Sequence, residues 1–394
     1  MFLQKLKGRN PGLVSAAAQL HRSGAITPTT YVIDLDAIEH NAGIIKKKAR
    51  ETGLKLYPMT KQLGRNPLAA QIMVSGTSGA VAVDIEGVKS LVKSDVRVGH
   101  VGHLLQTPVN DIPFVLEKAK PEVITVFTVE KAAQISEHAK KMNGRQDLLL
   151  RIAGEKCFFY PMQEGGFTLD ELPDAVEKIS GLEGVRIAGV TTFPVLVFDP
   201  KTKGAATTPN FGLMMRGADI LSQKGCSVDQ INAPGTTSTC VMDLLKERGA
   251  THVEPGHGFA GMTPLHAFEN LPEIPAVVWV TEISHAYNGS LYAYGYGFGP
   301  DTLACGDYDK RGFVGPSPDT VMDRTVRVED FYPAMDYIIK LEGRDDVSVG
   351  DTVVFGFRQQ ISFSTAKVAV LRGVQSGNPE LAGLFDRTGN SLEW

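Results

Sequence analysis

Short apolar runs alternate with longer amphipathic segments through the first two thirds of this chain. The runs are typical of buried strands, and the helical patterns between them are clearest over 129–142 and 169–179. Alternating strands and helices favour a parallel sheet. Eight strands spaced through about 200 residues predict a closed (β/α)8 TIM-type barrel rather than an open doubly wound sheet. The expected strands span 56–60, 79–83, 96–101, 123–127, 148–152, 186–191, 230–233 and 252–254.

The pattern changes on both sides of this region. A short helix is expected over 10–23 and a strand over 30–34. After residue 268, expected strands are joined by turns rich in Gly, Pro and Asp, and the stretch 376–394 is expected to be irregular. The chain is therefore predicted to be an α/β protein with three parts: a helix and strand over 1–35, the strand packing on the later β domain, a barrel over 36–268, and a smaller, mostly-β C-terminal domain over 269–394.

Composition argues against two classes of partner. The net charge is -4 and the basic residues are scattered, so no nucleic acid partner is expected. No apolar run is long enough to span a bilayer, and the first residues lack the apolar core of a signal peptide, so no membrane partner is expected. The four cysteines have neither metal-ligand spacing nor a dense disulfide pattern. These features favour a cytoplasmic location and no metal.

One lysine occupies the position where a barrel places catalytic groups. Lys61 ends the first expected strand and is followed by a turn containing Gly64 and Pro67. Catalytic side chains in a barrel come from the carboxyl ends of its strands. Most lysines beside a turn are solvated surface charges, however, so Lys61 needs support from the other strand ends.

The loop after the seventh expected strand has the composition of an anion site. Gly235, Thr236, Thr237 and Ser238 are small enough to let backbone amides approach a phosphate, and their hydroxyl groups add donors at the start of a helix. An ordinary Ser/Thr helix cap has the same appearance. The position after strand seven favours phosphate binding.

The eighth expected strand ends in a carboxylate. Glu254 could point into the barrel mouth, where a buried carboxylate is costly unless it is paired, so a cationic partner is expected. Gly256 and Gly258 permit close backbone approach on either side of His257. The alternative is a carboxylate on the rim that faces water.

An amine, a phosphate cradle and a buried carboxylate are together what pyridoxal 5'-phosphate needs. The lysine forms the Schiff base, the loop holds the phosphate, and the carboxylate keeps the pyridine nitrogen protonated. The sequence therefore predicts this cofactor on Lys61, with a small-molecule amino acid as substrate.

Other strand ends carry weaker signals. Arg151 could contact the phenolic oxygen of the cofactor or form an ion pair at the barrel rim. Phe193 could pack on a flat ring or belong to the core. His100 and His103 are expected to be structural.

The second domain offers candidates for a further acid or base. Tyr294 and Tyr296 lie in a stretch rich in Tyr and Gly, which is either a flexible aromatic surface or the wall of an active site. Cys305 could act if its pKa is lowered.

These residues resemble the fold-type III pyridoxal-phosphate enzymes, the alanine racemase and ornithine/diaminopimelate decarboxylase superfamily. Within it, the chain is most similar to the YhfX-like group, which carries an alanine-racemase-type N-terminal domain. Lys61 falls where the family places its Schiff-base lysine, and Arg151 lies in a segment like the one whose arginine is near the cofactor in the decarboxylases. Glu254-Pro255-Gly256 resembles the decarboxylase element whose glutamate meets the pyridine nitrogen. The resemblance covers about residues 28–372.

The resemblance implies a cofactor more firmly than a reaction, because alanine racemases carry arginine where this chain has Glu254. The expected activity is an amino-acid racemase, in which Lys61 exchanges the proton on one face of the α-carbon. Tyr294, Tyr296 or Cys305 would exchange the proton on the other face, and this residue would come from the partner subunit of a homodimer with shared active sites. The alternatives are a decarboxylase, a lyase or aldolase of the same superfamily, and a non-catalytic carrier of the cofactor.

Overall fold

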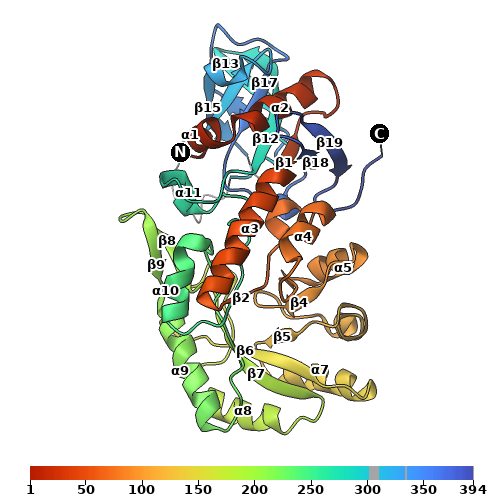
Figure 1. The fold of residues 1–394 in the computed structure, drawn as a ribbon, viewed down its shortest axis with the longest axis vertical. Helices are drawn as coiled ribbons and strands as arrows, with labels where there is room; N and C mark the ends of the chain where they lie inside the picture. The colour runs from red at the N-terminus through yellow and green to blue at the C-terminus, as the bar shows by residue number, and fades with distance from the viewer. Residues whose placement is uncertain (301–309, 333–334, 394) are drawn as a thin grey trace.

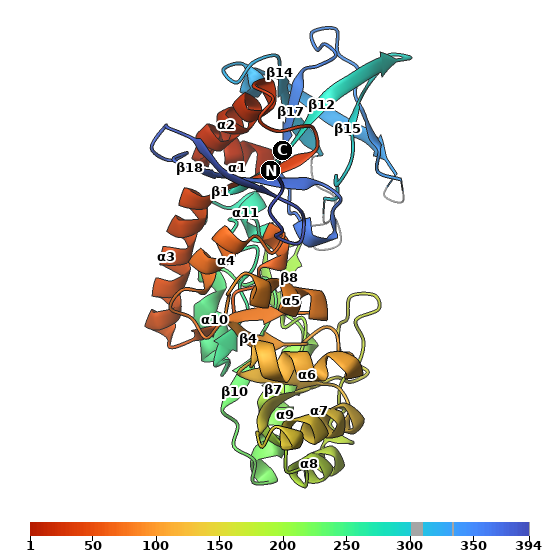
Figure 2. The same ribbon diagram turned by 90° about the vertical axis from the view of Figure 1, so that its right-hand side faces the viewer.

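The computed structural model describes residues 1–300, 310–332 and 335–393, so Cys305 lies outside the described residues. The molecule is elongated, with a barrel at one end and a β-rich domain at the other (Figures 1 and 2). No helix in the described ranges is long and apolar enough to cross a membrane.

Residues 55–253, all of them described, carry an eight-stranded parallel sheet in the order β2-β11-β10-β7-β6-β5-β4-β3. The two end strands also meet, since Met59 forms a parallel bridge with Val81 and the Val81 N–H donates to the Pro58 carbonyl at 3.0 Å. The predicted TIM-type barrel is therefore confirmed. Its strands are β2 Lys55–Leu56, β3 Ala80–Ala82, β4 Val98–Val101, β5 Val123–Val126, β6 Gln146–Arg151, β7 Val185–Thr191, β10 Gln230–Asn232 and β11 His252–Val253.

Helices cover the outside of this barrel (Figure 2). The longest is α3 (Leu35–Thr52). The Asp34 carboxylate caps its start by accepting hydrogen bonds from the N–H groups of Asp36 and Ala37, and Gly53 in the left-handed conformation follows its last residue. The others are α4 Pro67–Val74, α5 Ile85–Lys93, α6 Ile112–Phe114, α7 Val129–Lys141, α8 Leu172–Ser180, α9 Pro209–Gln223 and α10 Met242–Glu247.

The C-terminal domain contains a six-stranded antiparallel barrel, formed by β12, β13, β16, β15, β14 and β17 of the described chain. β12 pairs with both β13 and β17, which closes the ring. This confirms the predicted second, mostly-β domain. The strands are β12 Val277–Tyr287, β13 Ser290–Tyr294, β14 Arg311–Gly315, β15 Thr325–Phe331, β16 Ile338–Leu341 and β17 Thr352–Phe355.

The N-terminal segment adds to this domain rather than to the first barrel. β1 (Thr30–Asp34) pairs antiparallel with β12 and parallel with β18 (Lys367–Arg372). Helices α1 (Phe2–Arg9) and α2 (Pro11–Arg22) pack beside the same sheet (Figure 2).

Besides β13, β14 and β16 of the second barrel, which were not predicted as strands, two further segments differ from the sequence-based expectation. The stretch predicted to be irregular contains β19 (Glu380–Phe385), which forms a strand by pairing with β18. A hairpin of β8 (Leu196–Asp199) and β9 (Gly204–Thr207) follows β7, where no strand was expected. β8, β9 and β19 are partly exposed, so their apolar patterns are weak.

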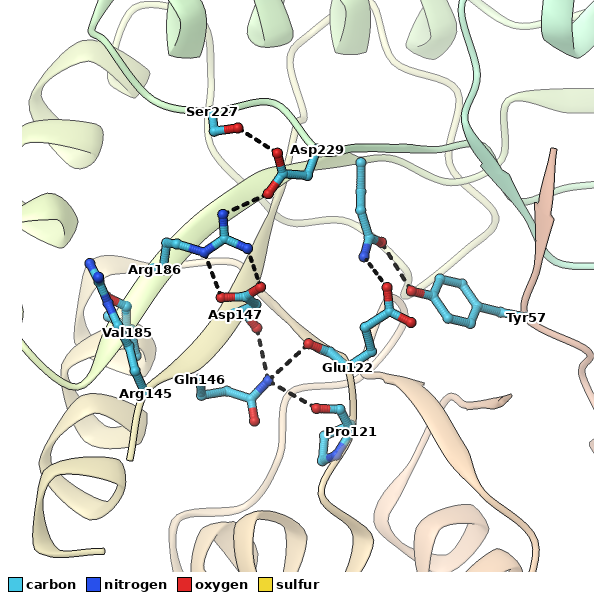
Figure 3. A network of polar contacts seen from close by, with 11 residues as sticks. Tyr57, Pro121, Glu122, Arg145, Gln146, Asp147, Val185, Arg186, Ser227 and Asp229 are labelled. Carbon is cyan, nitrogen blue, oxygen red and sulfur yellow. Dashed lines mark hydrogen bonds and ion pairs between the residues drawn. The ribbon is translucent and has the colours of Figure 1, made fainter. Parts of the chain in front are cut away.

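The amino ends of the barrel strands are closed by a polar network (Figure 3). Arg186 donates through Nε to Asp147 at 2.8 Å. Gln230 donates to Glu122 at 2.9 Å and accepts from the Tyr57 hydroxyl at 3.1 Å. In barrels this end stabilises the fold, whereas the carboxyl ends of the strands carry the chemistry.

Candidate active site

A cavity of about 230 Å³ opens at the carboxyl ends of the barrel strands, next to the C-terminal domain. Residues from both domains line it, including Thr263 after β11 and Arg358 after β17. It also contains most of the residues that the sequence singled out, namely Lys61, Phe193, Gly235, Thr236, Thr237, Glu254, Gly256 and His257.

Lys61 lies on a short 3₁₀ turn (η1, Lys61–Leu63) directly after the first barrel strand. Its carbonyl accepts from the Ser362 hydroxyl at 2.7 Å, and its Nζ lies 5.7 Å from the centre of the Phe363 ring. Burial, reinforced by the charge of Arg358, lowers the pKa of Lys61 to about 8. A useful fraction of this amine is therefore neutral and nucleophilic near physiological pH.

Glu254 is the buried carboxylate, and the partners that the sequence required are histidines. Oε1 lies 2.6 Å from His100 Nδ1 and accepts from the Asn232 amide at 2.7 Å, while His103 Nδ1 lies 2.9 Å from Oε2. Burial would raise the pKa of Glu254, but His103 and His100 outweigh that effect and hold the pKa below its usual range. Glu254 is therefore ionised, and His100 donates from Nδ1 while its Nε2 faces Thr125 Oγ1 at 2.6 Å.

These three side chains also have the composition of a metal site. Ligand atoms of His100, His103 and Glu254 lie within 4.8 Å of one another, the one such cluster found in the described ranges. The hydrogen bonds from His100 and Asn232 already satisfy Glu254 Oε1 without an ion. The arrangement fits an ionised carboxylate held for a cofactor at least as well as a metal-ligand set.

The loops after β10 and β11 pack backbone against backbone. Gly235 has a φ of 134°, and a Cβ there would lie 2.9 Å from the carbonyl oxygen of Leu196. A Cβ on Gly258 would lie 2.6 Å from the carbonyl oxygen of Thr237. Neither loop could approach so closely with larger residues. Ser238 belongs to the first of these loops but, like Gly258, does not line the cavity.

Arg151 ends β6 beside the cavity without lining it. Its side chain is fully buried, it donates from Nη2 to the Gln163 carbonyl at 2.5 Å, and the Phe127 ring lies 4.6 Å from its guanidinium carbon. Nε and Nη1 have no hydrogen-bond partner among the described residues, and no described carboxylate forms an ion pair with this side chain. Glu164 is close enough to oppose the lowering of the Arg151 pKa by burial, but it does not form an ion pair with Arg151 in the described part of the chain.

The residues fit pyridoxal 5'-phosphate. Lys61 offers a neutral amine, Glu254 an ionised carboxylate, and the loop from Gly235 small residues with accessible backbone. Arg151 has two buried donors that an anionic oxygen could satisfy. Phe193 lies in the cavity wall, with its ring centre 5.4 Å from that of His103 and 5.9 Å from that of Tyr160.

The candidates for a second acid or base lie elsewhere. Tyr294 ends β13 and Tyr296 follows it, packing on Tyr337 with ring centres 5.4 Å apart. Both are exposed on the C-terminal domain and neither lines the cavity of its own chain. Their role stays a prediction.

Sequence reasoning missed Arg358 and undervalued two histidines. Arg358 follows a strand of the second domain, where no positional rule indicates catalytic residues. His100 and His103 could have been found from the requirement that Glu254 needs partners, since His100 is the penultimate residue of an expected strand of the same barrel.

Comparisons with known proteins agree with this architecture. Residues 33–264 match the family Alanine racemase, N-terminal domain, and residues 278–381 match YhfX-like, C-terminal domain. The Uncharacterized protein YhfX of Escherichia coli (strain K12) is 37% identical over 399 residues, which covers 100% of both chains.

Solved structures with the same fold differ in activity. D-threonine aldolase from Filomicrobium marinum is 15% identical with a TM-score of 0.65, covering 92% of this chain and 95% of its own. Alanine racemase from Clostridium difficile 630 is 15% identical with a TM-score of 0.61, covering 92% and 99%. D-threo-3-hydroxyaspartate dehydratase from Delftia sp. HT23 is 13% identical with a TM-score of 0.65, covering 92% and 97%. Likeness at such identity is evidence of fold alone.

Proteins with the alanine racemase fold use pyridoxal 5'-phosphate, as the sequence predicted for this chain. The chain therefore belongs to the alanine racemase-like family of fold-type III pyridoxal-phosphate proteins, with a YhfX-like C-terminal domain.

Proposed function

We propose that this protein is a pyridoxal-phosphate-dependent amino-acid racemase acting at the α-carbon. The observation that carries the proposal is Lys61, a half-buried amine with its pKa lowered to about 8 in a cavity shared by two domains. When bound, pyridoxal phosphate supplies an aldehyde that captures the substrate amine and a ring that accepts negative charge from the α-carbon.

The chain's own residues divide the remaining tasks. Lys61 Nζ would hold the cofactor at rest and would take or return the α-proton on one face of the substrate. Glu254, which His100 and His103 keep ionised, would accept a hydrogen bond from the protonated ring nitrogen. The loop 235–238 and the segment 256–258 would hold the phosphate, Arg151 would donate to the phenolic oxygen, and Phe193 would cover the ring.

The second face of the substrate needs its own acid or base. Tyr294 and Tyr296 are exposed and could reach the site of another copy, so we propose a homodimer in which Tyr294, Tyr296 or Cys305 of the partner subunit protonates that face. Under this arrangement, racemisation uses two groups on opposite faces of the α-carbon, one from each chain.

A lyase, an aldolase or dehydratase, is the second candidate. By keeping the ring nitrogen protonated, Glu254 would assist cleavage of a bond to the α-carbon as well as proton exchange, and decarboxylation would benefit in the same way. D-threonine aldolase and D-threo-3-hydroxyaspartate dehydratase share the fold. A non-catalytic carrier is disfavoured because Arg358 and Gln360 of the C-terminal domain line the cavity, which a carrier would not need.

A panel of D- and L-amino acids, including β-hydroxy and acidic ones, tests the proposal. Each is incubated with the purified holoprotein, and the products are scored for loss of optical activity, aldehyde, keto acid, ammonia and CO2. We expect at least one amino acid to lose optical activity with wild type and none with Lys61→Ala. Formation of aldehyde, keto acid or CO2 without racemisation would replace the racemase proposal by the lyase or decarboxylase.

A further inference from the structure

The loop that carries Arg358 is fixed to the barrel at two points directly after this residue. The carbonyl of Gln359 lies 2.6 Å from His257 Nε2, which must donate because a carbonyl can only accept. Three residues later, the Ser362 hydroxyl donates to the Lys61 carbonyl at 2.7 Å. Arg358 is thus held in register with the strand ends that carry Lys61 and His257.

The same loop is anchored within its own domain. The Phe357 ring packs against Tyr31 at 6.2 Å and Phe298 at 5.4 Å between ring centres, and Ile361 is fully buried. An arginine on such a support is preorganised, so little side-chain entropy is lost when a ligand binds to it.

The cavity has an excess of positive charge near Lys61. Its lining contains the cations Lys61 and Arg358, and Glu254 is the one carboxylate among the described lining residues. Glu254 is already engaged by His100 and Asn232. Burial lowers the pKa of Arg358 to about 10, so the guanidinium remains charged at neutral pH, and its charge is the largest electrostatic contribution to the lowered pKa of Lys61. An anionic group between the domains would relieve this repulsion.

The position of Arg358 indicates whether it binds a phosphate or a carboxylate. A phosphate would be served by the close-packed loops of the barrel that begin at Gly235 and Gly256, whereas Arg358 comes from the other domain beside Lys61. In an α-amino acid, one carbon separates the carboxylate from the amine that would replace Lys61 on the cofactor. The planar guanidinium can bind both oxygens of a carboxylate.

We propose that Arg358 binds the α-carboxylate of the amino-acid substrate, so that the C-terminal domain selects α-amino acids over amines that lack this group. The proposal deepens the racemase function and rests on it for the identity of the substrate, but the carboxylate site itself can be tested without any reaction.

The test is calorimetric titration of the holoprotein with propionate, an unreactive carboxylate, for wild type, Arg358→Gln and Arg358→Lys. Loss of a bidentate charged pair should weaken propionate binding by about ten- to hundredfold in Arg358→Gln and by less in Arg358→Lys, which retains the charge. Arg186→Gln, at the opposite end of the barrel, should bind propionate as wild type does (Figure 3).

Cofactor affinity, measured on the same variants, shows whether Arg358 binds the substrate carboxylate or the cofactor phosphate. We expect Arg358→Gln and Arg358→Lys to bind pyridoxal phosphate with nearly wild-type affinity. Equal propionate binding by wild type and the variants, no propionate binding to wild type, or a loss confined to cofactor affinity would each overturn the proposal. Arg358→Lys provides the comparison if Arg358→Gln does not fold. If no amino acid racemises while propionate binding still depends on Arg358, racemisation fails and the carboxylate site stands.

Discussion

The substitution Arg151→Met tests whether Arg151 binds the cofactor or stabilises the fold. The guanidinium of Arg151 is fully buried, and only Nη2 has a protein acceptor, the Gln163 carbonyl. Burial lowers the pKa of this group to about 10, a sign that the charge is costly where it lies. Methionine keeps much of the volume without the charge.

The expected change in stability follows from opposing contributions. Two buried donors without a protein partner, Nε and Nη1, cost about 1–3 kcal/mol each, and the substitution removes that cost. It also removes the hydrogen bond to Gln163, worth about 1.5–3 kcal/mol, and the contact with the Phe127 ring, worth about 1–2 kcal/mol. These contributions nearly cancel, so the free energy of unfolding of the apoprotein should change by less than about 2 kcal/mol.

Cofactor binding should respond differently. Losing one charged hydrogen bond to the cofactor should weaken its affinity about ten- to hundredfold, and each tenfold loss removes about 1.4 kcal/mol of the stabilisation that saturating cofactor confers. Denaturant unfolding with and without pyridoxal phosphate, together with a cofactor titration, measures both quantities. An apoprotein destabilised by more than about 3 kcal/mol with unchanged cofactor affinity would refute the reasoning and make Arg151 a structural residue.

Three further predictions concern the same cavity. Gly235→Ala should weaken cofactor binding by about tenfold or more, because its Cβ would lie 2.9 Å from a carbonyl oxygen at a φ of 134°. The control is Gly212→Ala in α9, where nothing lies within 4 Å of the added Cβ. This variant should bind the cofactor as wild type does and be more stable by up to about 1 kcal/mol. Equal affinities in these two variants, measured by titration, would contradict the assignment of the loop. Glu254→Gln should retain the cofactor on Lys61 but lower kcat about a hundredfold or more, since a neutral amide cannot stabilise the protonated ring nitrogen; an unchanged kcat would rule out this role. The rate at which pyridoxal phosphate attaches to the apoprotein should rise with pH and level off above about 8, because only neutral Lys61 is nucleophilic and its pKa lies well below the usual 10.5. Arg358→Gln should move that midpoint upward by removing a neighbouring cation, and a midpoint that stays near 10 in wild type would contradict the environment described for Lys61.

The barrel could be predicted because its strands are buried on both faces. Such strands read as continuous apolar runs, as Val123–Val126 does, and they are bounded by polar turns. The hairpin of β8 and β9 and the strand β19 were missed since they are stabilised by pairing with a neighbour more than by burial of their own side chains. Closure of the second barrel likewise depends on pairings between distant segments that no local pattern encodes.

The residues of the candidate site likewise fall into those that the sequence could predict and those that it could not. Lys61, Glu254 and Gly235 were found because the barrel fold gives their positions meaning, each at the carboxyl end of a strand. Arg358 reaches the cavity only through the packing of two domains, anchored by His257 and Ser362. Contacts of this kind arise from tertiary structure and leave no spacing in the sequence.

An absorbance spectrum of the purified protein with pyridoxal phosphate tests the central claim most directly. It is recorded across the near-ultraviolet and visible range for wild type and Lys61→Ala, before and after borohydride. The expected result is the band of a lysine-linked cofactor in wild type, its loss on reduction, and its absence from the variant. A wild-type protein that stays colourless with added cofactor, or a Lys61→Ala protein with the same reducible band, would contradict it.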